Sequence, residues 1–93
     1  MKILAVCGMG LGSALLLRML VEKAVKKLNI EADVTVADIS TARGAGSDAD
    51  IIVTSAELAE QLGSVKGKII TIKNYVDVNE MTEKLSKAVS EDA

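Results

Sequence analysis

Residues 3–18 read Ile-Leu-Ala-Val-Cys-Gly-Met-Gly-Leu-Gly-Ser-Ala-Leu-Leu-Leu-Arg, and this stretch decides the fold. Its first four residues form an apolar run typical of a buried strand, and an amphipathic pattern typical of a helix begins at Ser13. Between them lie the only cysteine of the chain, Cys7, and three glycines at alternate positions. Glycine lets the backbone approach a ligand closely, and a helix N-terminus favours a bound anion. The stretch therefore predicts a strand, an anion-binding loop and a helix.

Cys7 lies where this loop begins, directly after the strand. A helix N-terminus lowers the pKa of a nearby cysteine thiol, so we expect a useful fraction of Cys7 to be thiolate at neutral pH. A phosphoryl group on the sulfur would carry close to two negative charges. Each charge-assisted hydrogen bond from a backbone amide contributes roughly 1.5–3 kcal/mol, more than the roughly 0.3–2 kcal/mol of a helix terminus. We therefore expect the loop amides to be the main stabilisation of a phosphocysteine. The predicted catalytic residue is Cys7, and the predicted phosphate-binding residues are Gly8, Met9, Gly10, Leu11, Gly12 and Ser13.

The same motif has other interpretations. A lone cysteine at a strand end is often a small buried hydrophobe. A dinucleotide fingerprint needs Gly-x-Gly-x-x-Gly, and a Walker loop ends in Gly-Lys-Ser/Thr; neither pattern is present. A cysteine phosphatase has an arginine six residues after the cysteine, where this chain has Ser13, so a main source of hydrolytic acceleration is missing. A phosphoryl carrier is favoured, while a small cysteine phosphatase-like hydrolase and a non-catalytic regulatory module of the same fold stay open.

Composition indicates one aliphatic domain, covering residues 1–93, in which Tyr75 is the only aromatic residue. The apolar runs are shorter than the roughly 18 residues of a membrane span, so we expect no direct membrane insertion. One cysteine and no histidine argue against a zinc site, and no metal or cofactor is expected. A net charge of -2 with mixed signs argues against a nucleic-acid partner. The lone cysteine and the missing signal pattern predict a cytoplasmic protein, and we expect a monomer.

Strand and helix patterns alternate along the rest of the chain. Asn29 is predicted to end the first helix, and the last helix is predicted to run from Asp77 to the end. The alternating strand at 33–37 is typical of a sheet edge, whereas the continuous β-branched run at 50–54 is typical of a central strand. The remaining predicted elements are an irregular crossing at 38–48 with a helical turn, a short helix that ends at Leu62 before Gly63, and a strand at 69–72.

Three successive strand-to-helix units require right-handed crossovers and a parallel sheet. The predicted fold is therefore an α/β single three-layer domain with a four-stranded parallel sheet and helices on both faces. We expect the strand order 2-1-3-4, because the strand that carries the reactive loop is most naturally interior, with the switch point beside it. The loops after the first, third and fourth strands then meet at one edge of the sheet. These segments are Cys7–Ser13, Thr54–Ser55 and Lys73–Tyr75.

Residues near this edge also have simpler roles. Thr54 and Ser55 are expected to be helix caps, with Thr54 and Glu57 forming a capping box, and Asp77 with Glu80 forms a second one. Arg18 is expected to be a solvated helix residue. Two other side chains, those of Met9 and Leu11, either pack onto the sheet edge or form a docking patch for a protein partner.

The loop motif resembles the phosphorylation loop of the enzyme IIB component of the bacterial phosphoenolpyruvate-dependent sugar phosphotransferase system. The resemblance is to the lactose/galactitol-like IIB superfamily and especially to its ascorbate-type branch. It extends to Asp50-Ile-Ile-Val-Thr-Ser and to Lys73-Asn74, and so covers nearly the whole chain.

This resemblance implies a four-stranded parallel sheet flanked by helices and the activity of a sugar phosphotransferase component. Cys7 would accept a phosphoryl group from a histidine of a IIA protein and donate it to a sugar bound by a membrane IIC transporter. The ascorbate-type loop commonly has a second hydroxyl residue where this chain has Ala14, so one phosphate contact is missing here. By the same resemblance, the sugar would be recognised mainly by the IIC partner.

Overall fold

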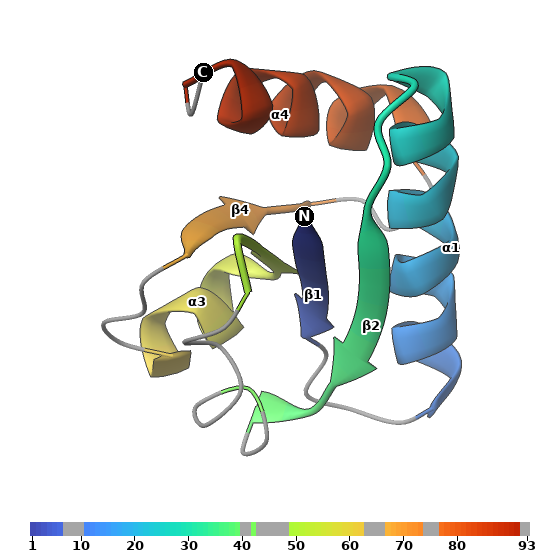
Figure 1. Cartoon of the computed structure of the whole chain (residues 1–93). Helices are drawn as coiled ribbons and strands as arrows, with labels where there is room; N and C mark the ends of the chain where they lie inside the picture. Colours follow the sequence, from blue (N-terminus) through green and yellow to red (C-terminus); the bar gives the residue numbers. More distant parts are fainter. Residues whose placement is uncertain (7–10, 40–41, 43–48, 63–66, 74–76, 92–93) are drawn as a thin grey trace.

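The computed structural model of the chain describes residues 1–6, 11–39, 42, 49–62, 67–73 and 77–91, with the backbone alone for residues 11–14 and 91. Within these residues, β1, β3 and β4 are each followed by a helix, and β3 is the next described element after β2 (Figure 1). The elements are β1 (Lys2–Val6), α1 (Leu11–Lys27), β2 (Asp33–Ala37), β3 (Ile51–Thr54), α3 (Ala56–Leu62), β4 (Lys68–Thr71) and α4 (Val78–Glu91).

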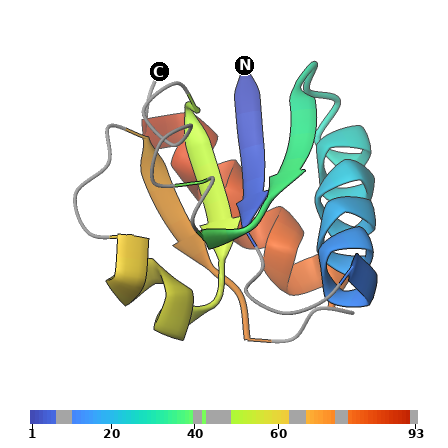
Figure 2. The ribbon, with the colours of Figure 1, turned by 90° about the horizontal axis from the view of Figure 1, so that it is seen from below.

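The four strands form one parallel sheet in the order β2-β1-β3-β4. Figure 2 shows the four arrowheads pointing toward the same edge of the sheet. In the register, Ile3 of β1 lies beside Val34 of β2 and Ile51 of β3. The predicted strand order 2-1-3-4 is confirmed.

The strands place alternate side chains on opposite faces of the sheet, and each face has its own apolar cluster. Odd-numbered residues of β1 and β3 pack against α1 and α4, where Leu17 and Leu85 are fully buried. Even-numbered residues of the same strands pack in a second cluster that contains Leu62 of α3. Two helices therefore cover one face and α3 covers the other, which confirms the three-layer prediction (Figure 2).

The two strand patterns in the sequence correspond to two positions in the sheet. β2 lies at an edge, and its residues Asp33 and Thr35 are exposed. All four residues of β3 are buried because β1 and β4 flank it and helices cover both faces. A strand at the edge of the sheet is partly exposed and alternates apolar with polar residues, whereas a central strand covered on both faces is continuously apolar.

Asn29 ends α1, as predicted, in the left-handed region with a φ of 56°. The Asn29 N–H donates to the Lys26 carbonyl (3.1 Å), and the Ile30 N–H donates to the Val25 carbonyl (2.9 Å). This pair of bonds is the Schellman motif, which satisfies carbonyl groups that the helix end would otherwise leave free.

Other element boundaries differ from the prediction by one or two residues. β4 covers Lys68–Thr71 rather than 69–72, although the Ile72 N–H still donates to the Thr54 carbonyl (2.9 Å). Most of the predicted crossing at 38–48 lies outside the described residues, as does Gly63. The Ala42 N–H donates to the Asp38 carbonyl (2.9 Å), which is the spacing of the predicted helical turn. In the described part of the chain, no helix is long and apolar enough to span a bilayer.

Candidate functional site

The candidate site lies at the edge of the sheet where the strands end. β1, β3 and β4 are neighbours and run parallel, so the segments that follow Val6, Thr54 and Thr71 all leave from this edge. Thr54 and Thr71 lie side by side in the register of β3 and β4. Helices α1, α3 and α4 follow these three strands, and their N-terminal ends therefore face the same side of the molecule (Figure 2). Helix N-termini carry partial positive charge, which favours an anion at this edge.

Four of the predicted site residues lie outside the described residues, namely Cys7, Gly8, Met9 and Gly10. Their predicted roles stay predictions. The structure does fix the two ends of this segment: β1 ends at Val6 and α1 begins at Leu11. Residues 7–10 thus connect the end of a strand at the carboxyl edge of the sheet to the start of a helix.

The prediction that α1 begins at Ser13 is wrong by two residues. Leu11, Gly12 and Ser13, which were predicted to lie in the phosphate-binding loop, form the first turn of α1. Glycine disfavours a helix by about 1 kcal/mol relative to alanine but does not exclude it, so the glycine spacing alone overestimated the loop. The first four N–H groups of an α-helix have no partner within the helix. Residues 11–13 therefore still supply backbone donors, from a helix terminus instead of from an irregular loop.

Thr54 and Ser55 have different roles, although both were expected to be caps. The Ser55 hydroxyl oxygen accepts a hydrogen bond from the Leu58 N–H (3.3 Å), as an N-cap of α3 does. The Thr54 hydroxyl instead donates to the Val6 carbonyl oxygen (3.0 Å), and its side chain is fully buried. The predicted capping role is thus confirmed for Ser55 and wrong for Thr54, because the N-cap position before Ala56 belongs to Ser55.

Helix α4 begins with a network that connects it to the end of β4. The Asp77 carboxylate accepts a hydrogen bond from the Glu80 N–H (3.1 Å), which is the N-cap bond of the predicted second capping box. The Glu80 carboxylate accepts from the Lys73 N–H (3.3 Å) and pairs with Lys84 (3.0 Å). Lys73 itself is exposed, whereas Asn74 and Tyr75 lie outside the described residues.

Arg18 does not contribute to the candidate site. Its guanidinium pairs with the Glu22 carboxylate one helical turn further along α1 (3.5 Å), and both side chains are 48% exposed. An exposed i,i+4 pair of this kind is weak and screened by salt. The prediction that Arg18 is a solvated helix residue is confirmed.

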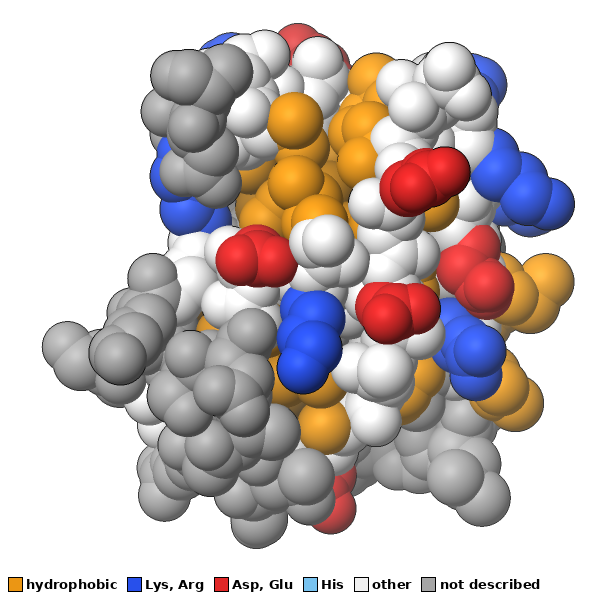
Figure 3. Space-filling view, in the orientation of Figure 1, with side chains coloured by type: hydrophobic (Ala, Val, Ile, Leu, Met, Phe, Trp, Pro, Cys, Tyr) orange, Lys and Arg blue, Asp and Glu red, His pale blue; other side chains and the backbone are white. Residues whose placement is uncertain are grey.

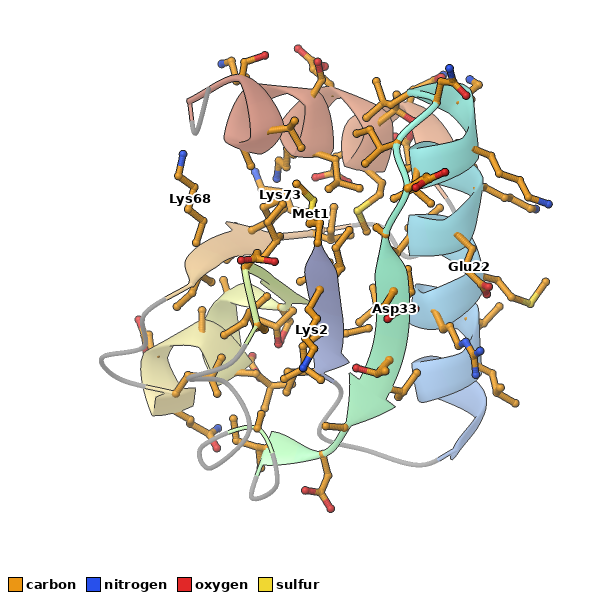
Figure 4. All side chains as sticks on the ribbon, viewed as in Figure 1. Met1, Lys2, Glu22, Asp33, Lys68 and Lys73 are labelled. Atoms are coloured by element: carbon orange, nitrogen blue, oxygen red, sulfur yellow. The ribbon has the colours of Figure 1, made fainter. Side chains whose placement is uncertain are left out.

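One hollow along the described residues lies away from this edge. It has a volume of ≈ 670 Å³ and is lined by Met1 and by residues of α1, of β2 and of the segment between them. Figure 4 labels three of its lining residues, Met1, Glu22 and Asp33. The charged side chains that line it are exposed and include both acidic and basic residues. This mixture does not form a group of donors directed at one anion. The chemistry of the chain is therefore assigned to the carboxyl edge and not to this hollow.

Comparison with known proteins gives the family. Residues 2–87 match the family model described as "PTS system, Lactose/Cellobiose specific IIB subunit". The chain belongs to this IIB family. As a IIB chain it is a phosphoryl-transfer component of the sugar phosphotransferase system.

Individual relatives resemble the IIB chain over almost its whole length. The ascorbate-specific PTS system EIIB component of Mycoplasma pneumoniae is 34% identical over 90 residues, which are 96% of this chain and 95% of that protein. The protein of the same description from Shigella dysenteriae is 30% identical, over 97% of this chain and 90% of its own. The lactose-specific IIB component domain of Streptococcus pneumoniae superposes with a TM-score of 0.54 at 17% identity, over 99% of this chain and 93% of its own. This last similarity concerns the fold.

The sequence placed Thr54 at this edge but missed the role of its buried hydroxyl. Its partner Val6 is 48 positions away in the chain, and no local pattern reports a bond of that separation. The available signal was a hydroxyl at the end of an otherwise aliphatic central strand.

Proposed function

We propose that this IIB chain carries the phosphoryl group on the sulfur of Cys7. Within the family, the chain offers only one cysteine and no histidine, so sulfur is its strongest covalent nucleophile. The position of the residue supports the proposal most directly, since Cys7 follows β1 and lies within four residues of the N-terminus of α1. Backbone N–H groups of residues 8–13 are proposed to hold the phosphoryl oxygens.

The proposed donor is a phosphohistidine of a IIA protein. The Cys7 thiolate attacks phosphorus, the S–P bond forms while the N–P bond breaks, and the leaving imidazole takes a proton from solvent. A thiolate is required for this attack, and a position near a helix N-terminus favours the thiolate over the thiol.

The proposed acceptor is a sugar bound by a membrane IIC transporter. A hydroxyl oxygen of the sugar attacks phosphorus, the O–P bond forms while the S–P bond breaks, the hydroxyl proton passes to solvent and the thiolate is regenerated. Two relatives are described as ascorbate-specific, so ascorbate is the first compound to supply as acceptor. We place the chain in the cytoplasm as a monomer, where a reducing environment keeps the single cysteine free.

The test is phosphoryl transfer from a phosphorylated IIA protein to the purified chain. We expect the wild type to take up one phosphoryl group per chain and to hydrolyse an aryl phosphate no faster than buffer does. Cys7→Ser should take up no sulfur-linked label, because serine has no thiolate to attack phosphorus. Thr82→Ser, a change far from Cys7 in sequence and on α4, is the matched control and should be labelled like the wild type.

Two results would contradict the proposal. If Cys7→Ser were labelled as the wild type is, another residue would be the acceptor. If the chain alone turned over an aryl phosphate many times, it would be a phosphatase and not a carrier.

A further inference from the structure

Thr54 is the one polar side chain that is buried among the described residues, with none of its surface exposed. Its neighbours in β3, Ile52 and Val53, are equally buried, as is Val6 of β1. A hydroxyl in such apolar surroundings is unfavourable unless it makes a hydrogen bond. Valine has nearly the same shape and would suit this position in the core without that requirement. The hydroxyl therefore calls for an explanation beyond packing.

The hydroxyl group has a defined partner. It donates to the carbonyl oxygen of Val6 at 3.0 Å, and this bond joins the last residue of β3 to the last residue of β1. The Val6 carbonyl belongs to the peptide group that links Val6 to Cys7. That peptide group is planar, so a bond that holds its oxygen also restrains the direction in which the chain leaves β1.

We propose that Thr54 is a positioning residue for Cys7. Its hydrogen bond holds the Val6–Cys7 peptide group at the edge of the sheet, where the phosphoryl group is handed over. A carbonyl that accepts a hydrogen bond also makes the N–H of the same peptide group a better donor, because hydrogen bonds in a chain polarise one another. Thr54 thus supports the cysteine in two ways without touching the phosphoryl group. It restrains the direction of the chain after Val6, and it polarises the peptide group that carries the Cys7 N–H. This inference rests on the function proposed for Cys7.

A purely structural role makes a different prediction. In that case the hydrogen bond to Val6 would serve only to give the buried Thr54 hydroxyl a partner. Its removal would lower the free energy of unfolding without changing the chemistry of Cys7. The chain contains a matched comparison in Thr82, whose hydroxyl donates to the Val78 carbonyl within α4 (2.7 Å). Both residues are threonines that donate to a backbone carbonyl, but only Thr54 donates to the peptide group of Cys7.

The experiment compares Thr54→Val, Thr54→Ser and Thr82→Val with the wild type in the full chain. Three quantities are measured: the rate of phosphoryl transfer from the phosphorylated IIA donor, the pH profile of Cys7 alkylation by iodoacetamide, and the free energy of unfolding in urea. We expect Thr54→Val to slow phosphoryl transfer by a factor between about 2 and about 10, the range for one lost hydrogen bond. Its alkylation profile should shift to higher pH. Thr54→Ser keeps the hydroxyl and should retain the wild-type profile, and Thr82→Val should change neither the rate nor the profile.

The inference is overturned if Thr54→Val transfers phosphate and reacts with iodoacetamide as the wild type does. It is also overturned if Thr82→Val is slowed to the same extent. A failure of the proposed function looks different, because the wild type itself would then take no label on Cys7. Even then, a shifted alkylation profile in Thr54→Val alone would support the positioning of Cys7, and an unshifted profile would refute it.

Discussion

Gly67 shows how a single residue sets the spacing between two strands. It precedes β4, where the Lys68 N–H donates to the Asp50 carbonyl (3.0 Å). A Cβ at position 67 would overlap the backbone carbonyl oxygen of Ala49 and would lie 3.1 Å from that of Asp50. Backbone atoms of a paired segment cannot move aside as the end of a side chain can. Glycine is therefore required at position 67 by close approach to the neighbouring segment.

Gly67→Ala should lower the free energy of unfolding by about 1–3 kcal/mol, the usual effect of forcing extra volume into a packed site. Urea unfolding followed by circular dichroism measures this change. Glu83→Ala, an exposed position on α4, is the control and should stay within about 0.5 kcal/mol of the wild type. Equal stability of Gly67→Ala and the wild type would mean that residue 67 does not lie as close to the backbone of Ala49 and Asp50 as the structure shows.

At the scale of the element, α1 buries one side and exposes the other. Leu17, Leu20 and Val21 belong to the cluster between the sheet and the helices. Leu15, Leu16 and Met19 are 58%, 49% and 52% exposed. Hydrophobic side chains accordingly project along the α1 side of the molecule (Figure 3). Adjacent leucines on this helix thus differ in burial although they are the same residue type.

This difference predicts opposite outcomes for two neighbouring substitutions. Leu17→Ala removes a fully buried side chain and should cost about 2–5 kcal/mol of stability. Leu16→Ala removes an exposed one and should change stability by no more than about 0.5 kcal/mol. Urea unfolding of the two variants gives the comparison directly. Similar losses for both would mean that α1 is rotated about its axis relative to the structure.

Helix α4 is secured to the sheet by two lysines in addition to its apolar face. Lys84 donates to the Thr71 carbonyl (2.5 Å), and Lys68, which Figure 4 shows extending toward α4, donates to the Ala88 carbonyl (3.2 Å). The Lys68 bond reaches a carbonyl in the last turns of α4, where a cation is favoured by the helix dipole. Together the bonds connect both ends of β4 to one helix.

At the scale of the whole molecule, the sequence predicted the arrangement of the elements better than their ends. The central and edge positions of two strands followed from the continuous β-branched run at 50–54 and the alternation at 33–37, and the sheet order followed from the interior place expected for the strand before Cys7. The start of α1 was predicted too late because glycines were treated as loop residues, although the first turn of a helix tolerates them. The Thr54–Val6 bond was not predicted because it joins residues 48 positions apart. Local patterns report local geometry, and the site depends on contacts between distant segments.

The candidate site combines both kinds of information. Its chemistry was predicted from Cys7 and the glycines that follow it, and family membership supports phosphoryl transfer. Its location follows from the parallel sheet, which brings the ends of β1, β3 and β4 to one edge.

The most direct test is to locate the phosphoryl group on the chain after transfer from the phosphorylated IIA protein. Tandem mass spectrometry of peptides prepared under conditions that preserve a sulfur–phosphorus bond assigns the modified residue. The account predicts that the phosphoryl group is found on Cys7 and that supplying the IIC transporter with its sugar removes it. A phosphoryl group on a serine or threonine, or one on Cys7 that the sugar does not discharge, would contradict the account.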